Sequence, residues 1–177
     1  MSHPAIARLR QLLPPPLSGG DALDWDALSD AASLRLPADY REFVEIYGGG
    51  ELDEYLSVST PPVPGSPYGD LLDGTDPALP PETRAELAAW FPDDMSPRLL
   101  PFGSTASSDV VFWMCVGSPD DWKVAVFRRQ SFHGTSRWIV FDGGMAEFLT
   151  AVLAGSIDPF SSSLEAGKHH YLNWRDE

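Results

Sequence analysis

The chain has 177 residues, and its 26 acidic against 12 basic residues give a net charge of −14 at pH 7. A chain this acidic repels phosphate, so we expect neither nucleic acid nor an anionic membrane surface as a partner, and a basic partner instead. The single cysteine, Cys115, excludes an intramolecular disulfide and no apolar run approaches the ~18 residues of a membrane span, so we expect a cytoplasmic protein of one domain, residues 1–177.

The first fifty residues are predicted to form three helices. Apolar residues recur at helical spacing over 4–13, and a second, shorter helix is expected over 22–32. The clearest helix begins near Pro37, and its apolar stripe consists of Tyr40, Phe43, Val44 and Tyr47. A phosphate-binding loop precedes a helix, whereas the glycines 48–50 follow this one, so we interpret them as a helix end.

The remainder of the chain is predicted to contain strands, two helices and one long loop. Seven prolines between positions 61 and 81 favour an extended loop. The C-terminal tail, 158–177, is mostly polar, so we expect it to be solvated. The expected strands are 55–58, 110–116, 124–127 and 138–141, and the expected helices are 81–91 and 145–153.

Large aromatic residues are predicted to form much of the core. The strongest candidates lie on apolar faces of the clearest elements and are Tyr40, Phe43, Trp113 and Phe148. Three tryptophans, at 113, 122 and 138, lie on or beside predicted strands and could form a ligand-binding platform. We favour core packing for them, and a buried, unreactive thiol for Cys115.

No catalytic, cofactor or metal site is predicted. Ser131 and His133 are close in sequence, but no third group completes a catalytic triad. His169 and His170 are adjacent, yet the chain has one cysteine and no H-E-x-x-H motif, which leaves zinc without its usual ligands. We therefore expect no enzyme, no cofactor and no bound metal.

The acidic residues are concentrated in one stretch. From Glu51 to Asp94 there are ten acidic residues and one basic residue, Arg84, whereas residues 122–141 carry four basic residues and no acidic one. We expect the acidic stretch to bind a basic partner, although a simple gain in solubility is the alternative. The predicted contact residues are Glu51, Asp53, Glu54, Asp70, Asp73, Asp76, Asp93 and Asp94, with Tyr55, Tyr68 and Leu72 as candidate apolar anchors.

Four blocks of sequence, taken in order, resemble a known group of proteins. These blocks are Leu-Pro-Ala-Asp-Tyr-Arg-Glu-Phe at 36–43 with Tyr-Gly-Gly-Gly at 47–50, Leu-Pro-Phe-Gly at 100–103, Asp-Val-Val-Phe-Trp at 109–113 with Trp-Lys-Val at 122–124, and Glu-Phe-Leu at 147–149. The chain thereby resembles the SUKH superfamily, which includes fungal regulators of cell-wall glucan synthesis and many bacterial immunity proteins. The resemblance implies an α+β fold, with a central, mainly antiparallel sheet flanked by helices.

The resemblance also implies a function. Bacterial members usually neutralise toxins of polymorphic systems, many of which are nucleases or deaminases. We therefore expect an immunity protein that blocks the active cleft of a cognate basic toxin, its acidic stretch taking the place of nucleic-acid phosphates. Two alternatives remain open: a regulatory scaffold of the cell-wall synthesis type, and a small hydrolase whose carboxylates the spacing does not pair.

Overall fold

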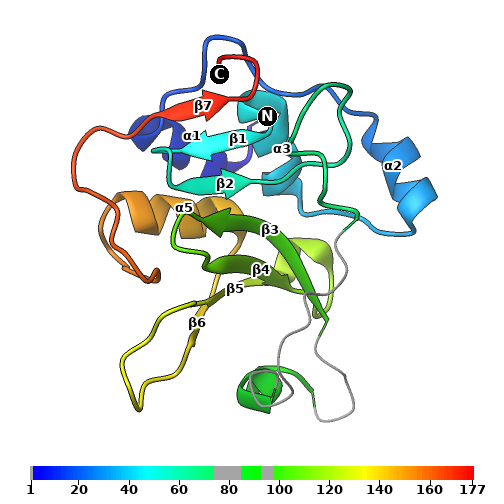
Figure 1. The fold of residues 1–177 in the computed structure, drawn as a ribbon. Coiled ribbons are helices and arrows are strands. Elements are labelled where there is room, and N and C mark those ends of the chain that lie inside the picture. The colour runs from blue at the N-terminus through cyan, green and yellow to red at the C-terminus, as the bar shows by residue number, and fades with distance from the viewer. Residues whose placement is uncertain (1, 74–84, 93–97) are drawn as a thin grey trace.

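A computed structural model describes residues 2–73, 85–92 and 98–177 of the chain. Within these residues, seven strands form one sheet in the order β6-β5-β4-β3-β2-β1-β7, and every neighbouring pair is antiparallel (Figure 1). The strands are β1 (Gly50–Leu52), β2 (Leu56–Val58), β3 (Leu99–Thr105), β4 (Val110–Met114), β5 (Lys123–Phe127), β6 (Trp138–Phe141) and β7 (Tyr171–Asn173). The predicted α+β fold with a central antiparallel sheet is confirmed.

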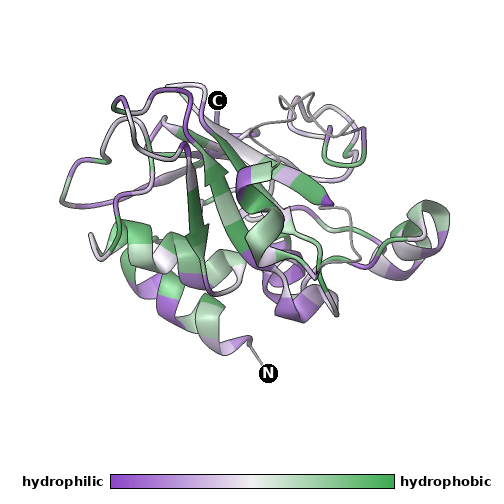
Figure 2. Cartoon of the chain, turned by 90° about the horizontal axis from the view of Figure 1, so that it is seen from below, coloured by the Kyte–Doolittle hydropathy of each residue, from purple (hydrophilic) through white to green (hydrophobic). Residues whose placement is uncertain are grey.

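Helices cover the inner face of this sheet. The α-helices are α1 (Pro4–Leu12), α2 (Trp25–Ala32), α3 (Ala38–Tyr47) and α5 (Met145–Leu153), and two short 3-10 helices are η1 (Ala88–Trp90) and η2 (Pro119–Asp121). Helices α1, α3 and α5 contribute to the same core cluster as the inner faces of the strands. In Figure 2 the strands are largely apolar, whereas the helices carry both apolar and polar residues, as expected of amphipathic elements packed on a sheet.

The core between helices and sheet is aromatic, as predicted. Tyr40, Phe43, Trp113 and Phe148 are all 0% exposed. The rings of Tyr40 and Trp113 meet edge to face with centroids 4.8 Å apart, a favourable arrangement for buried aromatic pairs. This contact fixes α3 against β4.

Helix α3 has a buried acidic residue at its first turn. Asp39 accepts a hydrogen bond from Ala146 N (2.9 Å) at the start of α5, and another from Tyr40 N (2.7 Å). Burial raises the pKa of Asp39 above its ordinary value, although these two hydrogen bonds oppose the shift. The other end of α3 stops at Gly48, whose φ of +68° confirms the predicted glycine helix end.

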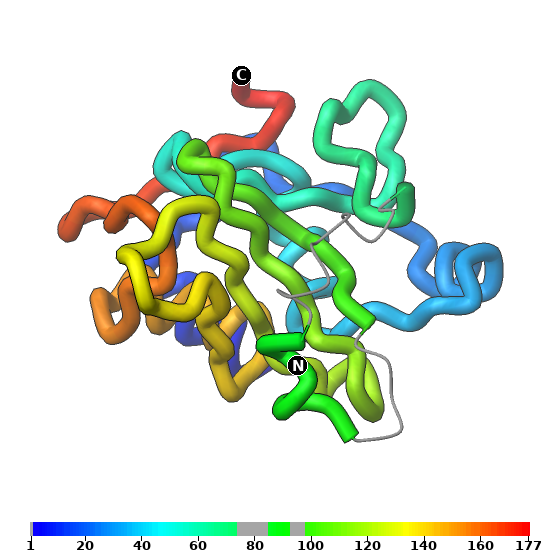
Figure 3. The backbone as a smooth tube through the Cα atoms, turned by 60° about the horizontal axis from the view of Figure 1, so that its bottom comes forward, coloured from blue at the N-terminus to red at the C-terminus, as the bar shows by residue number. Residues whose placement is uncertain are grey.

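The outer face of the sheet carries a second, smaller cluster. Phe112, Phe127 and Trp138 from β4, β5 and β6 are buried there against Leu87 and Phe91. Figure 3 shows the segment that carries Leu87 and Phe91 lying in front of these strands. Trp113 and Trp122 belong to the inner core and Trp138 to the outer cluster, so core packing is confirmed for all three tryptophans.

Two predictions about irregular segments are wrong. The chain between 60 and 71 is a closed loop rather than an extended one, because Thr60 N donates to Tyr68 O (2.7 Å) and Leu71 N donates to Thr60 O (3.1 Å). Leu71, 1% exposed, anchors the end of this loop.

Parts of two predicted segments lie outside the described residues. These parts are 74–81 of the predicted loop and 81–84 of the predicted helix 81–91. The rest of that helix is helical at 85–87 and continues as η1.

The C-terminal tail is also not simply solvated. Residues 171–173 form β7, which pairs with β1 at the edge of the sheet (Figure 1). Tyr171, Asn173 and His169 are buried. The tail is polar in composition, but Tyr171 and Asn173 are buried where β7 pairs with β1, a strand that lies more than a hundred positions earlier in the sequence.

Candidate functional site

One half of the outer sheet face is left partly open. Glu51 of β1, Ser57 of β2, Ser104 of β3 and Val110 of β4 are successive cross-strand partners, so their side chains share this face. All four are partly or fully exposed, whereas the alternate residues of β1 and β2 are buried in the core. We call this row of four residues the open face. Its residues on β1, β2 and β3 are polar, and Val110 on β4 is apolar.

A pocket of about 180 Å³ lies beside the open face. It is lined by Ser59, Asp70, Leu71, Pro101, Gly103, Ser104 and Val110. Asp70 itself is exposed, and its neighbours supply apolar walls and two hydroxyl groups. Apolar walls beside a carboxylate suit the aliphatic stem and charged head of a lysine or arginine side chain. We call this feature the Asp70 pocket.

The C-terminus adds negative charge near the open face. Tyr68 Oη donates to Glu177 Oε1 over 2.6 Å. Burial, the hydrogen bond to Glu177 and the nearby charge of Glu51 all raise the pKa of Tyr68, so its phenol stays protonated and remains a donor. Three residues far apart in the sequence therefore lie together, and two of them are carboxylates.

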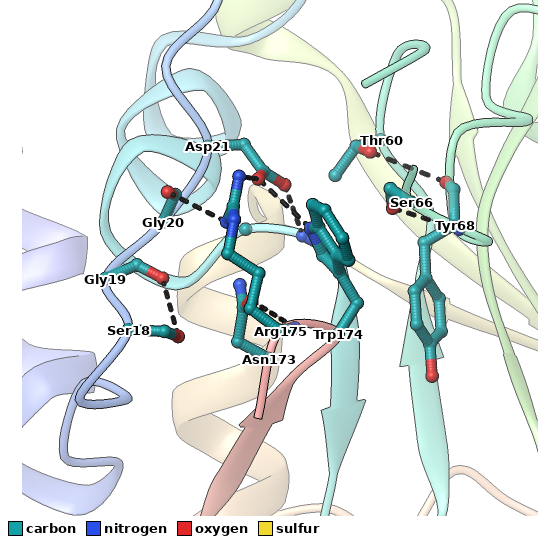
Figure 4. Close-up of polar contacts among 12 residues, drawn as sticks. Ser18, Gly19, Gly20, Asp21, Thr60, Ser66, Tyr68, Asn173, Trp174 and Arg175 are labelled. Atoms are coloured by element: carbon teal, nitrogen blue, oxygen red, sulfur yellow. Dashed lines mark hydrogen bonds and ion pairs between the residues drawn. The ribbon is translucent and has the colours of Figure 1, made fainter. Parts of the chain in front are cut away.

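A buried carboxylate holds the C-terminal segment in this position. Asp21 is 0% exposed, and its Oδ1 lies 2.7 Å from Arg175 Nη2. Asp21 also accepts hydrogen bonds from Gly49 N (2.9 Å) and Trp174 Nε1 (3.2 Å). Figure 4 shows Arg175 and Trp174 converging on Asp21, with Tyr68 to one side. We call this set of contacts the Asp21 lock. It joins the segment before α2 and the start of β1 to the end of the chain.

The acidic residues predicted as contacts occupy different environments. Asp70 and Asp73 are exposed, Glu51 is half-buried on the open face, and Glu54 is exposed at the β1–β2 turn. Asp53 is engaged by its own chain, since Oδ2 lies 2.6 Å from His169 Nδ1 and Oδ1 accepts from His170 N (2.9 Å). The other predicted contacts, Asp76, Asp93 and Asp94, lie outside the described residues.

The candidate anchors are less exposed than their sequence positions suggested. Tyr55 Oη donates to Ser162 O (2.8 Å), and its ring packs edge to face on Phe160. Tyr68 is half-buried and bonded to Glu177, as described above. Leu72 is half-buried beside the fully buried Leu71. The structure brings Asp70 together with Ser104 and Val110, two residues that no sequence pattern singles out.

The described residues contain no group of three or more histidine, cysteine, aspartate or glutamate side chains placed to hold a metal ion. Burial raises the pKa of the Cys115 thiol to about 11, which keeps it protonated and unreactive at neutral pH. In the part of the chain that the structure describes, no helix has both the length and the apolar character needed to cross a membrane.

Fold and site together define a single-domain α+β protein, with helices on one side of an antiparallel sheet and an acidic, partly open face on the other. Residues 20–151 match the family model of the SMI1/KNR4 family (SUKH-1). The chain belongs to this family. The searches of curated proteins and of solved structures returned no match.

Proposed function

We propose that the protein is an immunity protein that binds a cognate basic toxin through the open face and the Asp70 pocket. The observation that carries this proposal is a pocket with apolar walls and the exposed carboxylate of Asp70 beside an open sheet face. Membership of the SMI1/KNR4 family supports a binding module rather than an enzyme. The toxin's active cleft, shaped to hold a polyanionic substrate, is the part that an acidic face would cover.

The charges at this face are available to a partner. Within the described chain, none of Glu51, Asp70, Asp73 and Glu177 forms an ion pair with a basic side chain. Their fields are therefore not cancelled locally, and they accelerate the approach of a basic protein. Complementary charge raises association rates from ~10⁵–10⁶ to as much as ~10⁸–10⁹ M⁻¹s⁻¹ at low salt. Fast capture suits an antidote, which must bind the toxin before the toxin reaches its target.

Affinity also needs buried contacts. A stable interface covers about 1,600 Å² in total, and a few well-packed residues supply most of its energy. The open face is largely polar, so the Asp70 pocket is the place where a long side chain of the partner becomes desolvated. An arginine or lysine of the toxin would lay its stem against Leu71, Pro101 and Val110 and pair with the carboxylate of Asp70.

The test measures association of the protein with its cognate toxin by stopped-flow fluorescence at low salt. The toxin gene is sought next to the gene for this chain. We expect Asp70→Asn/Asp73→Asn to slow association about three- to tenfold and to reduce its dependence on salt. Dissociation should also accelerate, because Asp70 lies in the pocket rather than at the rim.

A matched control removes the same charge elsewhere. Asp26 and Asp30 are exposed on α2, so Asp26→Asn/Asp30→Asn changes the net charge equally. This control should associate nearly as fast as the wild type. Equal rates for both double variants, with full protection of cells against the toxin, would show that the open face is not the binding site.

A further inference from the structure

The hairpin between β5 and β6 is basic in a chain that is otherwise strongly acidic. Residues 122–141 contain Lys123, Arg128, Arg129 and Arg137 and no acidic residue. Arg129 and Arg137 are exposed, and neither forms an ion pair with any carboxylate of the described residues.

An exposed aromatic residue lies at the tip of this hairpin. Phe132 is 87% exposed, the most exposed aromatic side chain of the described residues. The tip is nevertheless ordered by its own hydrogen bonds. Thr135 Oγ1 and N both donate to Phe132 O (2.7 and 3.0 Å), and Arg128 Nη2 donates to Ser136 O (2.8 Å). In Figure 1 the loop projects away from the rest of the chain. These hydrogen bonds therefore hold the tip in one conformation, in which the apolar side chain of Phe132 is exposed to solvent.

The base of the hairpin is braced by other elements. Gln130 N donates to Ser161 Oγ (3.1 Å), and Arg129 N donates to Asp109 Oδ1 (2.8 Å). Asp109 is 0% exposed, so its charge is not presented at the surface. On the other side Ser136 Oγ donates to Glu86 Oε2 (2.8 Å). These two carboxylates contact the hairpin through backbone and hydroxyl groups. Among the described residues no carboxylate pairs with the guanidinium groups of Arg129 and Arg137, and that of Arg137 lies over the Phe127 ring, 6.0 Å from its centroid.

The hairpin ends in an open strand edge. Strand β6 is the outermost strand of the sheet on its side (Figures 1 and 3). Arg128 N donates to Arg137 O (2.8 Å), and hydrogen-bonded pairs alternate along an antiparallel ladder. The N–H and C=O of Val140, whose cross-strand partner is Ala125, therefore point away from β5. Neither group finds a partner among the described residues, and such an edge accepts a further strand.

We propose that β6 and its basic hairpin form a second docking surface, which takes an extended acidic segment of a partner protein as an added strand. Backbone groups of that segment would pair with the edge at Val140. Its carboxylates would meet Arg129 and Arg137, and an apolar side chain would cover Phe132. This surface lies at the opposite end of the sheet from β1 and β7, so the open face remains free.

The charge of the whole chain favours a protein over a nucleic acid as the occupant. A net charge of −14 repels a polyanion over a distance, whereas a short acidic segment has few charges, and a strand edge provides backbone pairing that only a polypeptide can use. A second copy of this chain would form a head-to-tail contact between its basic hairpin and its acidic stretch. Repeated head-to-tail contacts build an open filament unless the copies close into a ring, so we favour a different protein as the partner.

The test is fluorescence anisotropy with the full chain and a short fluorescein-labelled peptide of alternating glutamate and valine. A peptide of alternating lysine and valine and a labelled oligothymidylate are the comparison probes. We expect saturable binding of the acidic peptide only. Arg129→Gln/Arg137→Gln should weaken it about fivefold or more, and Phe132→Ser should weaken it as well.

The matched control is Arg10→Gln/Arg35→Gln, which removes two exposed arginines outside the hairpin and should leave binding unchanged. Val140→Pro removes the outward N–H of the edge and also the Val140 side chain, which packs against the outer cluster. It should weaken binding, provided that its thermal melt shows a folded protein. Three results would overturn the proposal: equal losses in both arginine variants, tighter binding of oligothymidylate than of the acidic peptide, or a dimer in light scattering that Arg129→Gln/Arg137→Gln abolishes.

Discussion

Replacing Asp21 by alanine is expected to destabilise the protein strongly, because the Asp21 lock joins three distant segments. The substitution leaves Gly49 N and Trp174 Nε1 without their acceptor. An unpaired buried donor such as Gly49 N costs ~1–3 kcal/mol, and the part-buried Trp174 Nε1 costs less. It also removes the ion pair with Arg175, whose side chain is 36% exposed and becomes hydrated instead. Together, the two unpaired donors and the partly exposed ion pair should lower the free energy of unfolding by about 2–4 kcal/mol.

Urea denaturation followed by tryptophan fluorescence measures this loss. The midpoint should fall with an unchanged slope, which shows that the native state keeps its extent of burial. Arg8→Ala is the control, because it breaks an ion pair whose two side chains are 59% and 48% exposed and should cost less than ~1 kcal/mol. A loss below about 1 kcal/mol for Asp21→Ala would refute the lock as a structural element.

Three further predictions concern the core, the pH dependence and metal content. Phe43→Ala should cost ~3–5 kcal/mol in the same titration, since its side chain is 0% exposed, and a loss near that of Arg8→Ala would contradict the core assignment. The pKa of Asp39 is raised in the folded state above the ordinary 3.8, so the native state holds this proton more tightly than the unfolded state does. As pH rises through the folded pKa, the wild type should therefore lose stability relative to Asp39→Asn. A stability difference that does not change with pH would exclude this linkage. Elemental analysis of protein purified without a histidine tag should find no stoichiometric metal, and one zinc per chain would overturn that expectation.

Elements with a strong local pattern could be predicted from the sequence. The apolar stripe of α3 and the glycines after it define that helix without reference to the rest of the fold. The strands β4, β5 and β6 are rich in β-branched and aromatic residues, which favour strands locally. Helix α5 likewise carries its own apolar face.

The missed elements depend on distant partners. Strands β1 and β7 have three residues each, too few for a periodic signal. They exist because β1 pairs with β2 on one side and with β7 on the other. Strand β3 contains Pro101 and Gly103, which argue against a strand, and a shift of register between these two residues accommodates them in the sheet.

Only the negative charge of the candidate site could be predicted from the sequence. Counting charges indicated an acidic surface, but not which carboxylates are free. Asp53 is engaged by His169, which lies 116 positions away, and Glu177 reaches Tyr68 across 109 positions. The Asp70 pocket depends on where the loop ending at Leu71 closes over β3, a consequence of tertiary packing that no local pattern encodes.

Hydrogen–deuterium exchange of this chain, with and without its cognate toxin, tests the proposed binding site most directly. Amides that become protected on binding mark the surface that the toxin covers. The proposal predicts protection of residues 50–59, 68–73 and 99–110, which surround the open face and the Asp70 pocket, with little change in α1 and α5. Protection confined to the helical side, or to the hairpin at 128–141, would contradict toxin binding at the open face.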